Sequence, residues 1–161
     1  FAGPTETAKN EAAALADTWD KSGFKVTLNP LTDAYYPTVQ DPNAKSDITW
    51  GGWGADWPNA STVIPPLFTD AGGWNLSHVA DSAFEAKIGE AFAQTDRAKQ
   101  AILWQDLNKY AVENVFAIPT FFGRSQTIAG NGVGVAIDGT PGAMYRWAAY
   151  GSWPYAQLFV K

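Results

Sequence analysis

The chain has 161 residues, of which 46% are hydrophobic and 17% charged, so it carries enough apolar sequence for a folded domain with a hydrophobic core. Its net charge of −5 and its lack of any Lys/Arg cluster argue against nucleic-acid binding and against electrostatic docking on an anionic membrane. It contains no cysteine, which excludes disulfides, thiolate metal sites and cysteine nucleophiles, and no apolar run is long enough to span a bilayer.

The first predicted element is a helix over residues 4–22, with Thr5 as its N-cap and Gly23 just beyond its end. Apolar and polar residues then alternate over 24–29, which predicts a half-buried strand that ends at Pro30. The helix prediction rests on apolar residues at helical spacing, namely Ala8, Ala12, Leu15 and Trp19.

The next predicted elements are a strand over residues 48–53 and a short helix that begins near Ser61. Pro65 and Pro66 are expected to keep this helix short, because proline has no N–H and disrupts a helix interior.

Two longer helices are predicted between residues 80 and 113. One apolar stripe defines the first helix, and Thr95 or Asp96 is expected to begin the second. The stripe of the first helix consists of Phe84, Ile88, Ala91 and Phe92, and the apolar face of the second consists of Leu103, Trp104, Leu107, Tyr110 and Ala111.

The C-terminal part reads as a strand over residues 115–122 followed by shorter strand-like pieces over 125–130, 133–137 and 155–161. The order helix, strand, helix, strand, two helices, strand predicts a mixed α/β fold with a layer of helices on a sheet.

Few residues favour catalysis. His78 is the only histidine and is interpreted as a solvated loop side chain. The sequence "GNGVG" (130–134) lacks the Lys and Ser/Thr of a phosphate-binding loop and fits a hairpin turn better. No spacing among the acidic residues selects a catalytic pair. The sequence therefore predicts a protein that is not an enzyme, with no cofactor and no metal.

The stretch "GGWGADW" (51–57) favours recognition instead. At the end of a predicted strand it would present aromatic faces, a carboxylate and open backbone at one place, where ligands collect in α/β sheets. A structural interpretation stays open beside it: Trp50 and Trp53 lie in the core, Asp56 caps a turn and Pro58 ends the strand.

Three segments resemble the family 5 extracellular solute-binding proteins, the oligopeptide- and dipeptide-binding components of bacterial ABC importers. "SDITWGGWGADWPNASTVIPPLF" (46–68) resembles the signature region of that family. "AAALADTWDKSGFKVTLNPL" (12–31) and "DRAKQAILWQDLNKYAVENVFAIPTFF" (96–122) are similar to its flanking helix–strand segments. The resemblance covers essentially the whole chain, but only about the C-terminal third of a family member.

The resemblance implies one lobe of a type II periplasmic-binding-protein-like fold, an α/β lobe with a mixed sheet flanked by helices. Residues 1–161 would form a single domain, the C-terminal lobe of a two-lobed protein. Residues 147–161 would be a tail or strand that returns toward the missing lobe. It further implies an extracytoplasmic location, periplasmic or at the cell surface, and a membrane permease as partner, and it leaves open whether the full-length protein has a lipid anchor.

The resemblance also implies a ligand site. Asp56 stands where peptide-binding members hold the α-ammonium of the peptide, a cation that needs a carboxylate partner once a closing cleft removes its water. The other implied ligand-binding residues are Gly52 and Gly54 through their backbone, Trp53 and Trp57 as walls, and Phe121 from a neighbouring strand.

Two alternatives stay open. "WPNAS" (57–61) departs from the acidic residue or proline that many peptide-binding members carry after the aspartate, and indole faces stack well on sugar rings. An oligosaccharide bound on an exposed platform of Trp53, Trp57 and Trp74 is therefore the alternative ligand. The isolated lobe could also dimerise through an unpaired strand or exposed aromatic residues.

Overall fold

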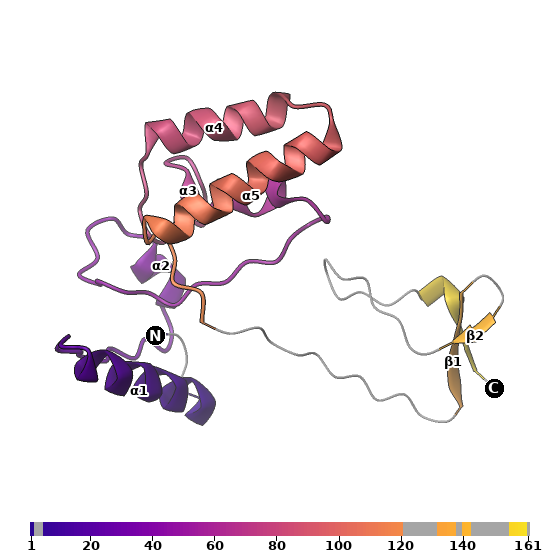
Figure 1. Ribbon diagram of the computed structural model, residues 1–161. Helices are drawn as coiled ribbons and strands as arrows, with labels where there is room; N and C mark the ends of the chain where they lie inside the picture. Colours follow the sequence, from indigo (N-terminus) through magenta and orange to yellow (C-terminus); the bar gives the residue numbers. More distant parts are fainter. Residues whose placement is uncertain (2–4, 121–131, 138–139, 143–154, 161) are drawn as a thin grey trace. The chain divides into compact units, whose positions relative to one another are not determined.

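The computed structural model divides the chain into two compact units, residues 1–52 with 66–81 and residues 53–65 with 82–161. Each unit is described by itself below. The predicted site residue Phe121 and the predicted strand over 125–130 lie outside the described residues. The structure describes residues 1, 5–120, 132–137, 140–142 and 155–160 (Figure 1).

Helix α1 (Glu6–Lys21) opens the first unit and confirms the first predicted helix (Figure 1). The Thr5 side chain accepts a hydrogen bond from the backbone N–H of Ala8 at 3.2 Å, as expected of an N-cap. Gly23 follows the helix with a φ of +95°, a left-handed conformation that glycine adopts without steric cost. Both predicted end signals are therefore confirmed.

The predicted strand over residues 24–29 is not formed. These residues have no regular secondary structure, and the Phe24 side chain is 68% exposed. The backbone N–H of Val26 donates to the Asp20 side chain at 3.0 Å instead of to a neighbouring strand.

Helix α2 (Tyr35–Val39) supplies most of the buried side chains of the first unit. The Tyr35 hydroxyl donates to the backbone oxygen of Trp50, and burial raises the pKa of this hydroxyl. The Tyr36 ring meets the Trp74 ring edge-on, with centroids 5.1 Å apart. Residues 48–53, predicted as a strand, have no regular secondary structure.

A short 3₁₀ helix, η1 (Ala60–Thr62), and helix α3 (Ile64–Phe68) stand where one short helix was predicted. Pro65 and Pro66 fall in the first turn of α3, where a missing N–H leaves no helical hydrogen bond unmade. The prolines therefore lie at the start of this helix, where they do not interrupt its hydrogen bonds.

Helices α4 (Ser82–Ala93) and α5 (Arg97–Glu113) lie side by side and antiparallel in the second unit (Figure 1). Asp96 caps α5 by accepting hydrogen bonds from the N–H groups of Ala98 and Lys99 at 2.9 and 3.1 Å. Both helices are confirmed, although Phe92 of the predicted stripe is 56% exposed. The buried residues of the pair are Phe84, Ile88, Ala91, Trp104, Leu107 and Ala111.

The end of α5 closes in a Schellman motif. The N–H of Phe116 donates to the carbonyl of Ala111 at 2.8 Å, and the N–H of Val115 donates to that of Val112 at 3.1 Å. Val115 occupies the position that usually holds glycine, with a φ of +58°. A β-branched residue is strained in this conformation.

Three short antiparallel strands, β1 (Val133–Ile137), β2 (Thr140–Gly142) and β3 (Leu158–Val160), form a sheet in the order β2-β1-β3. Val135 of β1 is opposite Gly142 of β2 and Leu158 of β3. A 3₁₀ helix, η2 (Tyr155–Gln157), precedes β3, so part of the predicted final strand is helical.

The predicted fold class, one lobe of a type II periplasmic-binding-protein-like fold with a mixed sheet flanked by helices, is wrong. The described residues are mainly helical, and their strands are few, short and antiparallel. The described parts of the predicted strands over 24–29, 48–53 and 115–122 carry the expected side-chain alternation or apolar run but no ladder of backbone hydrogen bonds. A strand needs such a ladder because it cannot satisfy its own N–H and C=O groups.

Across the described part of the chain, no helix has the length and apolar character that crossing a membrane requires.

Candidate functional site

The loop before α3 is organised around one buried polar side chain, Thr62, which is only 3% exposed. Its hydroxyl donates to the Asp56 carboxylate and accepts from the Asp56 backbone N–H, both at 2.8 Å. Its backbone oxygen accepts from the indole N–H of Trp53 at 2.7 Å. Three hydrogen bonds therefore close residues 53–62 into a compact turn.

These bonds give Asp56 and Trp53 structural roles in the loop. The Asp56 carboxylate holds the turn through Thr62, which is the geometry of the structural interpretation of the sequence. The Trp53 indole N–H is likewise used inside the loop, although the side chain stays 36% exposed.

A second set of hydrogen bonds fixes this loop to the α4–α5 pair. Asn59 caps η1 by accepting from the N–H of Ser61 at 2.9 Å, and its amide donates to the side-chain oxygen of Gln100 at 3.2 Å. The Gln100 amide in turn donates to the carbonyls of Ala91 and Gln94 at 2.9 and 3.2 Å. Gln100 thus satisfies carbonyls at the end of α4 and positions the loop at the same time.

A hollow of about 300 Å³ lies between this loop and the two helices, and we call it the Trp57 hollow. Its size is at the lower end of the range for small-molecule sites. The Trp57 side chain is 54% exposed, and the half-exposed Phe92 ring is held edge-on by Trp104 with centroids 5.4 Å apart. The lining residues are Trp57, Pro58, Asn59 and Ser61 from the loop and Phe92, Arg97 and Gln100 from the helices.

Arg97 is the charged residue of the Trp57 hollow. It is the first residue of α5, and within the described residues no hydrogen bond or ion pair engages its guanidinium. The hollow therefore combines two aromatic faces with a positive charge, whereas the sequence predicted aromatic faces with the negative charge of Asp56.

The other predicted site residues that the structure describes are not among the residues that line the Trp57 hollow. Gly52 and Gly54 are exposed, neither has a positive φ, and a Cβ added at either would meet no atom within 4 Å. Trp74 is half-buried against Tyr36 in the first unit.

Of the predicted residues that the structure describes, only Trp57 lines the hollow. Sequence reasoning missed Asn59, Phe92, Arg97 and Gln100. Only Asn59 carried a sequence signal, as a helix N-cap.

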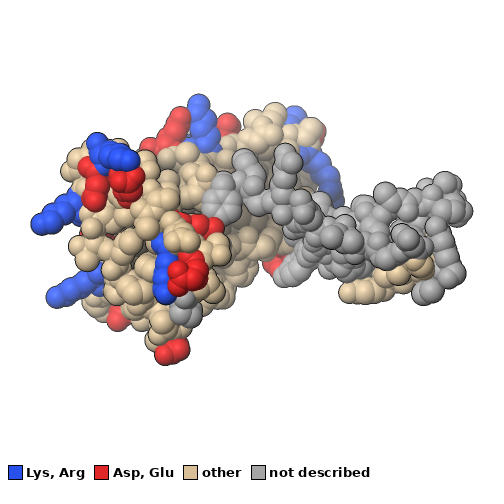
Figure 2. Space-filling model, turned by 90° about the horizontal axis from the view of Figure 1, so that it is seen from below, with Lys and Arg blue, Asp and Glu red and all other residues tan. Residues whose placement is uncertain are grey.

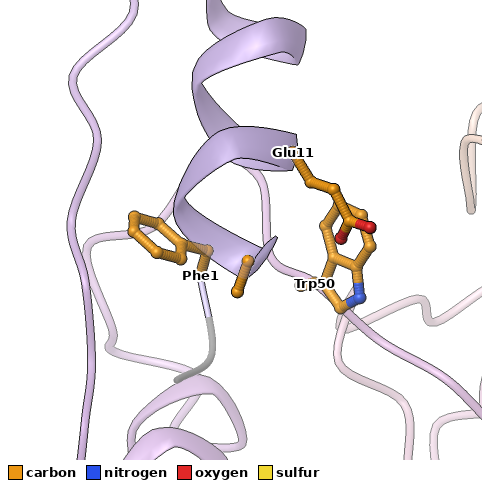
Figure 3. A pocket seen from close by; sticks show the side chains of 4 residues that line it. Phe1, Glu11 and Trp50 are labelled. Carbon is orange, nitrogen blue, oxygen red and sulfur yellow. The ribbon is translucent and has the colours of Figure 1, made fainter. Parts of the chain in front are cut away.

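A much smaller space of about 40 Å³ lies in the first unit beside the beginning of α1. Figure 3 shows Phe1, Glu11 and Trp50 around it. This volume suits one or two water molecules and is too small for an organic solute.

Neither the face shown in Figure 2 nor the metal-ligating side chains of the described residues indicate a competing site. Figure 2 shows acidic and basic side chains interspersed on the visible face, without a patch of one sign. In the described ranges, no three His, Cys, Asp or Glu side chains gather as metal ligands would. His78 is exposed in its loop, as expected.

Compared with known proteins, the sequence matches no protein-family model and no curated protein.

Proposed function

We propose that this chain is the ligand-contacting part of an extracytoplasmic solute-binding protein, and that it captures a short peptide or a related small solute for an ABC importer. The observation that carries the proposal is the Trp57 hollow, in which two exposed aromatic side chains and an unengaged guanidinium line a space large enough for a small solute. The three sequence segments that resemble family 5 solute-binding proteins support the same function. The proposal does not depend on a mixed sheet.

We place the solute at Trp57 rather than on the Asp56 carboxylate. One oxygen of that carboxylate accepts from the buried Thr62 hydroxyl, so Asp56 already has a structural role in the turn. The Trp57 ring has no such structural role, because the described hydrogen bond of Trp57 is one in which its backbone oxygen accepts from the Asn59 N–H. Exposed aromatic side chains that lie together in a hollow offer apolar area that a ligand or partner can cover.

An oligosaccharide is the second candidate ligand. The half-exposed Trp57 ring favours it, because a flat apolar face beside polar side chains suits a sugar ring. An oligosaccharide would then contact the Trp57 and Phe92 rings, and not the platform of three tryptophans predicted from the sequence.

In either case the bound solute would act by differential affinity: the ligand-bound conformation of the full-length protein is stabilised and docks on the membrane permease. Binding to the folded state also raises the free energy of unfolding, by about 2.7 kcal/mol when the free ligand is at about 100 times its dissociation constant.

The test is a thermal-shift titration of the chain with short peptides and with cello-oligosaccharides. A ligand of either class should raise the melting temperature of the wild type. Trp57→Ala should abolish the shift, and Phe24→Ala should keep it, because Phe24 is an exposed aromatic residue that does not line the hollow. The proposal is wrong if neither class produces a shift, or if the shift survives in Trp57→Ala.

A further inference from the structure

Arg97 occupies a position that the helix itself does not favour. A cation in the first turn of a helix faces the positive end of the helix dipole, so α5 gains nothing from this charge. The neighbouring Asp96 carboxylate is used as the N-cap and binds the N–H groups of Ala98 and Lys99. The guanidinium has no partner among the described residues, yet it lines the Trp57 hollow.

The other polar groups of the hollow are partly used. The Asn59 and Gln100 amides bind each other, and Gln100 also binds two carbonyls of the α4 end, so these residues shape the hollow. The N–H groups of the Arg97 guanidinium are available to a ligand. Two of them can donate in parallel to the two oxygens of a carboxylate, which gives a bidentate pair. Trp57 and Phe92 provide apolar surface for the part of the ligand beside that carboxylate.

We propose that the solute carries a carboxylate that binds Arg97, and that the apolar or ring portion of the solute beside this carboxylate contacts Trp57 and Phe92. This inference rests on the proposed function. The carboxylate is supplied either by the C-terminus of a short peptide or by a uronic acid in an oligosaccharide. The proposed ligand is therefore an anionic solute. The sequence did not predict this, because the site expected from it centred on the Asp56 carboxylate, which would bind a cation.

The experiment is isothermal titration of the chain with two matched pairs of probes. One pair is a short peptide with a free C-terminus and the same peptide amidated. The other pair is an oligogalacturonate and a neutral cello-oligosaccharide of equal length. In at least one pair the carboxylated probe should bind about tenfold more tightly than its neutral counterpart, because hydrogen bonds to charged groups are the strong ones.

Arg97→Gln should remove this preference. Lys99→Gln should leave it unchanged, because Lys99 lies in the same helical turn but does not line the hollow. Arg97 is exposed, so its substitution is expected to leave the fold intact, which circular dichroism checks.

The pair that shows the preference identifies the source of the carboxylate. Equal binding of both members of each pair, unaffected by Arg97→Gln, would overturn the anionic-solute inference and leave the proposed function standing. Absence of binding by every probe would overturn both.

Discussion

The α4–α5 pair and the loop over residues 53–62 belong to the same unit but are held together by different forces. Between the helices, Phe84 stacks on Tyr110 with centroids 5.5 Å apart and meets Phe116 edge-on at 5.2 Å. In the loop, the hydroxyl and carbonyl of Thr62 take part in three hydrogen bonds, to Asp56 and Trp53. The helix pair is therefore stabilised by buried apolar area, and the loop by a few directional hydrogen bonds.

This difference bears on function, because the loop presents Trp57. Burial is spread over many contacts, so the helices provide a rigid base for the Trp57 hollow. The loop is held by a few hydrogen bonds of Thr62 and Asn59, and it is the part of the site expected to adjust to a solute.

The largest effect is expected from Phe84→Ala. The side chain is fully buried between the helices, and truncation of a buried phenylalanine typically costs about 3–5 kcal/mol of the free energy of unfolding. Urea denaturation measures the loss. Phe92→Ala is the control, with a clearly smaller loss because that ring is half-exposed. Equal losses for the two variants would show that burial does not govern this helix pair.

Thr62→Val should have an intermediate effect. Valine keeps the shape but removes the hydroxyl, which leaves the Asp56 N–H and carboxylate without this partner, at a cost of about 1–3 kcal/mol. Thr62→Ser retains the hydroxyl and should lose much less. The same urea measurement applies, and near-neutral stability of Thr62→Val would mean that the loop does not depend on this side chain.

The smallest effect, and one of opposite sign, is expected from Val115→Gly. Glycine relieves the strain of a positive φ but loses more backbone entropy on folding, so a net gain of up to about 1 kcal/mol is expected. Thermal unfolding detects it. Val112→Gly, inside the last turn of α5, should destabilise instead. A loss of stability in Val115→Gly would contradict the strained geometry assigned to the end of this helix.

The long helices and the strand over residues 133–137 were predicted correctly, whereas the mixed sheet flanked by helices was wrong, for a physical reason. The hydrogen bonds of α5 join residues four apart, so the spacing of Trp104, Leu107 and Ala111 and the cap at Asp96 suffice to predict it. The strand predicted at 24–29 needed a partner strand, and alternation in its own sequence says nothing about whether one is present.

The site was predictable only in part for a similar reason. Trp57 stands out as an aromatic residue in an unusual stretch, and the structure places it on the Trp57 hollow. Asn59 and Gln100 are 41 residues apart in sequence, and no local pattern pairs them. Arg97 reads as an ordinary charged residue near a helix start until the structure places it beside Trp57 and Phe92.

The central claim, that a solute binds at Trp57, is tested most directly by NMR of the indole N–H signals. The chain has eight tryptophans, and single Trp→Phe substitutions assign the signal of each. On addition of the peptide or oligosaccharide that raises the melting temperature, the Trp57 signal should shift strongly, while those of Trp19 and Trp50 in the first unit should stay in place. A shift at Trp19 or Trp50 with an unchanged Trp57 signal would contradict the account.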